Sequence, residues 1–336
     1  MIYTVITTIN GLTKPIEEFL TLPKFNNIIV IGDKGGIDID SHIKGLQYYS
    51  YERQLSLNEF KSIDMPFHHY SRKNLGYLLA IRAGATEIFE TDDDNFPYKE
   101  QSLSSFKNAN RLVLELSELT SFNCYQLFSD EKIWPRGFPL HEVTKTQNFD
   151  ISSEMVNADI VQGLADKDPD VDAIYRLTQA SDEFKFSKGN SSYALPKGIY
   201  CPFNSQNTLW SHRVFALMYL PVTVSFRFTD ILRSFVAKRC LDHMQKSLAF
   251  APATVFQERN AHDLYKDFSD ELECYQNTPH VLKSLSSMEM NEKNSPEEAL
   301  LNCYQQLVYD KLVSDKELEY VHNWVDDLTA IQTELK

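Results

Sequence analysis

Apolar runs and helix-like segments alternate along the first part of the chain. Residues 2–9 and 27–32 are short β-branched runs closed by polar residues or glycine, as buried parallel strands tend to be. Residues 15–20 lie between them and can supply a helix. Residues 71–83 have leucines at helical spacing and lead directly into a strand that begins at Glu87. This order predicts βαβ units in a doubly wound α/β sheet, whose ligands bind at the carboxyl ends of the strands.

The pattern changes in the second half of the chain. Residues 105–235 mix strand-like runs with many loops punctuated by proline and glycine, and loops of this kind usually build a site. Residues 228–249 read as helical, and residues 261–336 are helical and acidic. We therefore expect two parts, a Rossmann-like domain over residues 1–250 and a helical C-terminal extension over residues 251–336.

Composition narrows the possible partners. The net charge of −14 repels phosphate backbones, so nucleic acid is not expected as a partner. An anionic ligand can bind only where local cations, backbone amides or a metal overturn that sign. The five cysteines form no CxxC pair and are odd in number, which predicts reduced thiols in a cytosol. No window approaches the roughly 20 apolar residues of a membrane span.

Three consecutive carboxylates, Asp92, Asp93 and Asp94, follow the strand that begins at Glu87. Adjacent carboxylates repel one another, so they are tolerated best where a divalent cation or bulk water neutralises them. A solvated acidic turn is the alternative, but the position after a strand in a βαβ unit favours a metal site. Mg²⁺ or Mn²⁺ suits all-oxygen ligands, and such an ion would bridge the phosphates of a nucleotide sugar.

Polar residues near the same sheet edge are candidates for donor binding. Arg72, Lys73 and Asn74 open the helix before the acidic strand and could offer two cations, an amide and free N–H groups to a diphosphate. An ordinary exposed basic helix start explains them equally well. Asp33, after the second strand, could accept hydrogen bonds from a ribose or base, and Thr7 lies at the end of the first strand.

Three further residues have weaker signals. Arg136 lies in a loop stiffened by two prolines, which could aim its guanidinium at a phosphate, although stiffness alone would explain the prolines. Asp230 begins a helix and could act as a general base, but spacing alone favours a helix cap. His262 could be a distant metal ligand, while an exposed surface histidine is the commoner interpretation.

Taken in order, several segments resemble the STELLO-like glycosyltransferase family and, more remotely, the reversibly glycosylated polypeptides that act as UDP-arabinopyranose mutases. They run from about residue 70 to residue 270, and their shared order is more specific than any single motif. These segments are Arg72-Lys-Asn-Leu-Gly-Tyr-Leu-Leu-Ala-Ile, Thr91-Asp-Asp-Asp-Asn, Trp134-Pro-Arg-Gly-Phe-Pro-Leu, Val161-Gln-Gly-Leu-Ala-Asp, Asp170-Val-Asp-Ala-Ile-Tyr-Arg-Leu, Cys201-Pro-Phe-Asn-Ser-Gln-Asn-Thr-Leu-Trp, Phe226-Arg-Phe-Thr-Asp-Ile-Leu-Arg and Gln257-Glu-Arg-Asn-Ala-His-Asp-Leu.

This resemblance implies a GT-A fold and a nucleotide-diphosphate sugar donor, with UDP as the expected nucleotide. It also implies a divalent cation, Mn²⁺ or Mg²⁺, held by the acidic triplet as a DXD motif, with Asp94 as the direct ligand. Asp230 matches the position of the base in inverting enzymes of this fold. His262 matches the late histidine that completes the metal shell.

The implied activity is transfer of a hexosyl or pentosyl unit to a saccharide or lipid-linked acceptor in surface polysaccharide synthesis. One alternative is a mutase that interconverts ring forms of a nucleotide sugar, for which Arg136 is the matching position. Another is a non-catalytic scaffold, with the C-terminal helices as the place for a protein partner. The plant members carry an amino-terminal membrane span that is not seen here, so a cytoplasmic enzyme is expected, with peripheral attachment to the inner face of the membrane as a variant.

Overall fold

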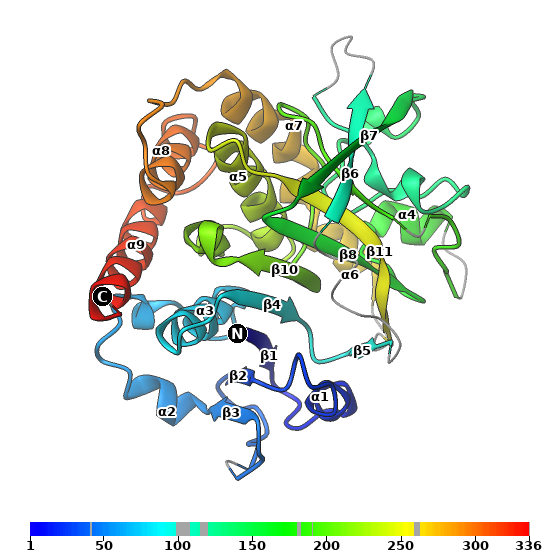
Figure 1. Ribbon diagram of the computed structural model, residues 1–336. Coiled ribbons are helices and arrows are strands. Elements are labelled where there is room, and N and C mark those ends of the chain that lie inside the picture. The colour runs from blue at the N-terminus through cyan, green and yellow to red at the C-terminus, as the bar shows by residue number, and fades with distance from the viewer. Residues whose placement is uncertain are drawn as a thin grey trace.

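The computed structural model describes residues 1–40, 42–98, 108–114, 120–179, 183–189, 191–258 and 263–335. Within these ranges, one mixed sheet of eleven strands runs through the molecule in the order β3-β2-β1-β4-β10-β8-β11-β9-β6-β7, and β5 pairs with β11 (Figure 1). The strands are β1 (Ile2–Thr8), β2 (Ile28–Gly32), β3 (Leu46–Tyr49), β4 (Glu87–Thr91), β5 (Asn95–Pro97), β6 (Asn108–Leu114), β7 (Phe149–Asn157), β8 (Ile160–Asp166), β9 (Ser192–Ala194), β10 (Asn207–Ser211) and β11 (Leu248–Gln257).

The α-helices of the described ranges begin near residue 14 and dominate the end of the chain. They are α1 (Lys14–Leu20), α2 (Tyr51–Leu55), α3 (Lys73–Arg82), α4 (Ala173–Thr178), α5 (Thr229–His243), α6 (Leu264–Asp270), α7 (Leu272–Ser287), α8 (Pro296–Tyr309) and α9 (Glu317–Glu334). The mixed sheet and the run of helices after β11 confirm the α/β fold expected for a GT-A enzyme with a helical C-terminal region.

The first four strands form the parallel part of the sheet. Strand β1 lies between β2 and β4 and is parallel to both, and β3 extends the sheet beyond β2. Helix α3 packs on β1 and β2, and Gly76 makes this contact possible, because a Cβ at that position would lie 2.5 Å from Val5 Cγ1. The predicted βαβ order is therefore confirmed, and the carboxyl ends of β1, β2 and β4 lie at one edge.

The structure corrects the expected helix over residues 228–249. Helix α5 ends at His243, Gln245 adopts a left-handed φ of 55°, and β11 starts at Leu248. Strand β11 lies between β8 and β9, and its alternate side chains pack into two different hydrophobic clusters. Because both faces are buried, its sequence is a continuous apolar run that resembles a helical one. The sheet therefore continues past residue 250, where we expected the first domain to end.

The C-terminal helices return to the N-terminal half of the molecule. Figure 1 shows α8 and α9 along one side, with α9 reaching the region of α3. The Trp324 indole N–H donates to the Ala216 carbonyl at 2.9 Å, and the Asp327 carboxylate accepts the backbone N–H groups of Lys61 and Ser62, each at 2.8 Å. One hydrophobic cluster runs from Tyr3 to Ile331. The two expected parts thus share a core.

All five cysteines are free and buried. Among the described residues, no helix is long and apolar enough to cross a membrane.

A buried carboxylate joins α9 to the loop before α5. Glu317 is fully buried and accepts from the Tyr219 hydroxyl at 2.6 Å, the Val222 N–H at 3.0 Å and the Thr223 N–H at 2.7 Å. We expect Glu317→Ala to lower the free energy of unfolding by about 3 kcal/mol, because it leaves several buried donors without an acceptor. Urea denaturation followed by tryptophan fluorescence measures this change, and Glu319→Ala in the same helix turn is the control. Two separate unfolding transitions in the unmodified protein would contradict the shared core.

Candidate functional site

A cavity of about 470 Å³ opens at the carboxyl ends of β1, β2 and β4. Loops from the second half of the chain close its other wall, so residues far apart in sequence meet there. Eight of the residues singled out from the sequence line it: Thr7, Asp33, Arg72, Asp92, Asp93, Asp94, Arg136 and Asp230. The structure therefore brings the acidic triplet and Asp230 into one site.

The first two carboxylates of the triplet are held by the protein. Asp92 Oδ1 accepts from the Tyr70 hydroxyl at 2.7 Å and from the Lys73 ammonium at 3.1 Å. Asp93 Oδ2 accepts from the Thr8 hydroxyl and, at 3.0 Å, from the Asn10 amide. Burial raises the pKa of Asp93, although these hydrogen bonds oppose the rise. Asp93 thus fastens the turn after β4 to the end of β1.

Asp94 is the carboxylate with an unused buried oxygen. Its Oδ2 accepts from the Gln257 amide at 2.9 Å, while its Oδ1 is buried and has no hydrogen-bond partner among the described residues. Burial, followed by repulsion from Asp92, raises the pKa of Asp94 to about 7. A buried carboxylate oxygen without a partner is costly unless a proton or a cation satisfies it. The Asp94 side chain therefore fits the direct metal ligand that the resemblance implies.

The rest of the expected metal shell is less complete. Within the described ranges, no group of three or more His, Cys, Asp and Glu side chains is arranged to hold a metal ion. His262, the expected distant ligand, lies outside the described residues. A hard cation in this cleft would therefore draw its remaining oxygens from Asp92, water and a bound diphosphate, as Mg²⁺ and Mn²⁺ sites in nucleotide enzymes do.

The basic segment before β4 is turned inward, contrary to the expectation that it meets the donor directly. The Arg72 guanidinium donates to Gln54 Oε1 at 3.1 Å and to the carbonyls of Ile63 and Met65, each at 2.9 Å. The Asn74 amide exchanges hydrogen bonds with the backbone of Leu220 at 2.9 and 2.8 Å. Both side chains are buried. Helix α3 is buried on nearly every side, so its polar side chains have internal partners.

Lys73 is also buried rather than exposed to a ligand. Its ammonium contacts the Thr91 carbonyl at 2.8 Å and the Ser205 carbonyl, the Tyr70 hydroxyl and Asp92 Oδ1, each at 3.1 Å. These contacts engage the ammonium fully. Lys73 therefore influences the cleft through its ion pair with Asp92, which lines the cavity.

Asp33 and Thr7 lie where the sequence placed them, at the ends of β2 and β1. Each Asp33 carboxylate oxygen accepts one backbone N–H at 2.7 Å, from Lys34 and from His68. His68 has a left-handed φ of 56°, so Asp33 holds a turn that lines the cavity. Both oxygens keep further lone pairs that a ribose hydroxyl can use.

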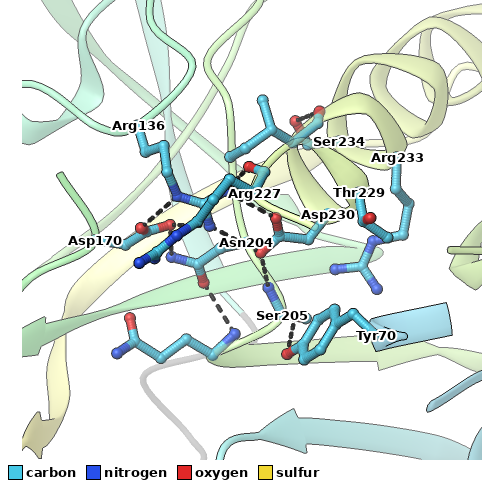
Figure 2. Close-up of polar contacts among 12 residues, drawn as sticks. Tyr70, Arg136, Asp170, Asn204, Ser205, Arg227, Thr229, Asp230, Arg233 and Ser234 are labelled. Atoms are coloured by element: carbon cyan, nitrogen blue, oxygen red, sulfur yellow. Dashed lines mark hydrogen bonds and ion pairs between the residues drawn. The ribbon is translucent and has the colours of Figure 1, made fainter. Parts of the chain in front are cut away.

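Arg136 lies between the carboxylates of Asp170 and Asp230 (Figure 2). Its guanidinium donates to both oxygens of Asp170 at 2.8 and 3.0 Å and to both oxygens of Asp230 at 3.2 Å. Asn204 adds a hydrogen bond to Asp170 at 2.8 Å. Burial disfavours the charged form of Asp170, but the adjacent Arg136 charge outweighs burial and keeps the pKa of this carboxyl below its usual value. A glycine at position 137, with φ of 83°, lets the loop approach Ile231 of α5.

Asp230 is not the helix cap that its spacing favoured. The N-cap of α5 is Phe228, and Asp230 lies in the first turn with its side chain directed to Arg136 and to the Ser205 N–H at 3.4 Å. It is only 6% exposed, yet it lines the cavity. An ordered carboxylate at a cleft wall is suited to take a proton from a bound hydroxyl.

A buried ion pair lies beneath the cleft and joins its two walls. Glu90, at the end of β4, accepts from Arg233 of α5 at 2.8 and 2.9 Å and from the Trp210 indole at 2.7 Å. Tyr77 also donates to Glu90. Glu90 precedes the triplet by two residues and Arg233 follows Asp230 by three, so this pair sets the spacing between the two groups.

The sequence did not single out several residues of the cavity wall. These are Tyr70, Asp170, Asn204, Arg176 and Phe226. Four of them, Asp170, Arg176, Asn204 and Phe226, belong to segments that carry the family resemblance, and that shared order was the available signal. Neither charge nor spacing distinguishes them from ordinary loop residues.

Residues 227–336 match the family model described as STELLO glycosyltransferases. The chain is 27% identical over 339 residues to "Probable glycosyltransferase STELLO1" of Arabidopsis thaliana, and 28% identical over 337 residues to "Probable glycosyltransferase STELLO2" of the same plant. Each alignment covers 94% of this chain and 43% of the relative, so the chain spans less than half of the length of these curated relatives. The similarity confirms the resemblance that the ordered segments indicated.

Two solved structures are also similar. Glucosyl-3-phosphoglycerate synthase from Mycobacterium tuberculosis, in complex with phosphoglyceric acid, has a TM-score of 0.39 and 12% identity, covering 87% of this chain and 81% of its own. TarS residues 1–349 from S. aureus, in complex with UDP-GlcNAc, has a TM-score of 0.37 and 10% identity, covering 98% of this chain and 80% of its own.

The pKa of Asp94 predicts how metal binding depends on pH. A cation bound at this carboxylate would compete with its proton, so its affinity would be full above the pKa of about 7 and would be lost as the pH falls through it. We expect Mn²⁺ binding at pH 7 to release about half a proton and binding at pH 8.5 to release almost none. Calorimetry in buffers of different ionisation enthalpy measures this release. Equal release at both pH values would contradict the assignment of Asp94.

Proposed function

We propose that this chain, which is similar to the STELLO glycosyltransferases over nearly all of its length, transfers a sugar from a nucleotide-diphosphate donor to an acceptor hydroxyl. The donor is UDP-linked, and the acceptor is a saccharide or a lipid-linked glycan of surface polysaccharide synthesis. The observation that carries the proposal is that one cavity holds both the Asp94 carboxylate, with its unused buried oxygen, and the ordered Asp230 carboxylate on the opposite wall.

The charge of the cavity supports a divalent cation as part of the donor site. Six aspartates and four arginines are among its lining residues, so the lining is net negative. The arginines already have protein partners: Arg176 pairs with Asp168, Arg227 pairs with Asp267, and Arg72 and Arg136 are buried in the contacts described above. A diphosphate would meet unfavourable charge here unless a cation accompanied it. Mn²⁺ or Mg²⁺ supplies that charge and stabilises the departing nucleoside diphosphate.

The protein's own residues then have separate tasks. Asp94 and Asp92 direct carboxylate oxygens toward the diphosphate side of the cleft, and Asp33 is placed for the ribose. Asp230 accepts the proton of the acceptor hydroxyl as that oxygen bonds to the anomeric carbon and the bond from this carbon to the diphosphate oxygen breaks. Arg136 and the Ser205 N–H hold Asp230 in one orientation. Attack from the face opposite the leaving group gives inversion.

The contacts of Arg136 disfavour the mutase alternative. All five guanidinium N–H groups have acceptors, because the carbonyl of Arg227 takes a further hydrogen bond beside those to Asp170 and Asp230. An arginine held in this way is charged and lacks a free nitrogen lone pair to attack a sugar. Arg136 therefore orients carboxylates in the proposed reaction.

We expect Asp94→Ala to abolish Mn²⁺-dependent UDP binding while the protein stays folded, because it removes the carboxylate that meets the cation. Calorimetry with UDP, with and without Mn²⁺, measures the loss, and circular dichroism checks the fold. The exposed residue Asp326 on α9 provides the control, since Asp326→Ala removes one negative charge far from the cleft. Retained Mn²⁺-dependent binding in Asp94→Ala would refute the metal assignment. Absence of UDP binding and of thermal stabilisation in the unmodified protein would favour the scaffold alternative.

We expect Asp230→Asn to lower the transfer rate by about a hundredfold or more, with little change in UDP affinity, because the amide cannot accept the proton. The rate is measured on the nucleotide sugar and acceptor that a product screen identifies. Asp242→Asn changes a buried carboxylate in the same helix, paired with Lys238, and controls for damage to α5. An Asp230→Asn protein with an unchanged rate would remove Asp230 from catalysis.

A further inference from the structure

Lys73 occupies the kind of site that proteins usually build for a bound cation. Its ammonium is fully buried and lies within 3.1 Å of four oxygens, which come from Thr91, Asp92, Ser205 and Tyr70. Two are backbone carbonyls, one is a carboxylate oxygen and one is a hydroxyl. An ammonium has three hydrogens and no acceptor, so these oxygens use its full capacity.

The partners of Lys73 connect the two walls of the cleft. Thr91 and Asp92 close β4, whereas Ser205 precedes β10 and also donates its N–H to Asp230. Tyr70 donates to Asp92 Oδ1 and accepts from the Ser205 hydroxyl, and Figure 2 shows this Tyr70–Ser205 contact beside Asp230. One positive charge thus lies among the groups that hold both Asp92 and Asp230.

The two outer carboxylates of the triplet, Asp92 and Asp94, have different hydrogen-bond partners. The hydrogen bonds of Asp92 all end on Oδ1, which faces Lys73 and Tyr70, and its side chain is 30% exposed. Among the described residues, no lysine or arginine donates to Asp94, which keeps the unused oxygen described above. Three adjacent negative charges would repel one another, and a fixed positive charge beside Asp92 reduces that repulsion before any ligand binds.

We infer that Lys73 is a positioning residue that acts as a permanent internal cation of the acidic triplet. It offsets the charge of Asp92 and holds Oδ1 of this carboxylate, so that the second oxygen is available to the cleft. The inference rests on the proposed function and assigns Lys73 a task other than direct contact with the diphosphate.

Replacing the lysine and restoring its charge from solution tests this role. Lys73→Ala removes three carbons and the ammonium, which n-propylammonium can supply again. We expect Lys73→Ala to weaken Mn²⁺-dependent UDP binding by about 10- to 100-fold, as loss of a residue that orients a metal ligand typically does. We expect n-propylammonium to restore most of the affinity and to raise the melting temperature of the metal-free variant. Tetramethylammonium at equal ionic strength has the same charge but no N–H groups, and should do neither.

Two further variants keep the test decisive if Lys73→Ala does not fold. Lys73→Met retains most of the side-chain volume without the charge. It should show the same loss of Mn²⁺-dependent UDP affinity, with no rescue by n-propylammonium or tetramethylammonium. Lys238→Met is the matched control, because Lys238 is a buried lysine paired with Asp242 on α5, outside the cavity lining. Its UDP affinity should equal that of the unmodified protein.

Mn²⁺–UDP binding by the unmodified protein shows whether a negative result contradicts the role of Lys73 alone or the proposed function as well. If the unmodified protein binds Mn²⁺–UDP and Lys73→Met binds it equally well, the inference about Lys73 is wrong and the proposed function stands. Equal rescue of Lys73→Ala by both ammonium ions would also overturn the inference, because ionic strength would then explain the restored affinity. If the unmodified protein binds no Mn²⁺–UDP, the proposed function fails, and with it the role given to Lys73.

Discussion

The buried pair of Glu90 and Arg233 is the constraint on which the arrangement of the cleft depends. It joins β4, which carries the acidic triplet, to α5, which carries Asp230, through two hydrogen bonds closed off from water. Loss of one partner would leave a buried charge without compensation, which is far more costly than losing an exposed pair. Trp210 and Tyr77 hold the same carboxylate, so the strand, the helix and their neighbours can take only one relative position.

The positive and negative side chains around this pair have different environments. An overall anionic chain places its cleft arginines and Lys73 inside, where each meets carboxylates or carbonyls of the protein. Among the described carboxylates that line the cavity, Asp94 is the one with a buried oxygen that has no hydrogen-bond partner. This contrast indicates that positive charge from outside belongs at Asp94. A cation there would allow a protein with a net charge of −14 to accept a phosphate ligand in this cavity.

Much of the N-terminal half follows from sequence because its signals are local. The strands at residues 2 and 28 are apolar runs with polar or glycine ends, helix α3 has leucines at helical spacing, and the acidic triplet directly follows a strand. The burial of Arg72, Lys73 and Asn74 could not be predicted from the same signals, because charged residues are rarely buried and only tertiary contacts reveal their partners. The apolar run of β11 was misread as helix for a related reason, since a strand buried on both faces has no period-two pattern. The place of Asp170 in the site depends on contacts with Arg136 and Asn204, which no local spacing encodes.

The path of the last helix has a consequence for any attempt to divide this protein. Asp327 caps a turn at residues 61 and 62, and Trp324 reaches Ala216, so the final segment is fastened to two regions separated by more than 150 positions in the chain. The stretch of 227–336 that matches the family model holds α5 to α9 but leaves their partners behind. Expressed by itself, that stretch would expose the apolar faces of its helices to solvent and would aggregate. A protease nick near residue 290 would therefore leave two fragments that remain associated.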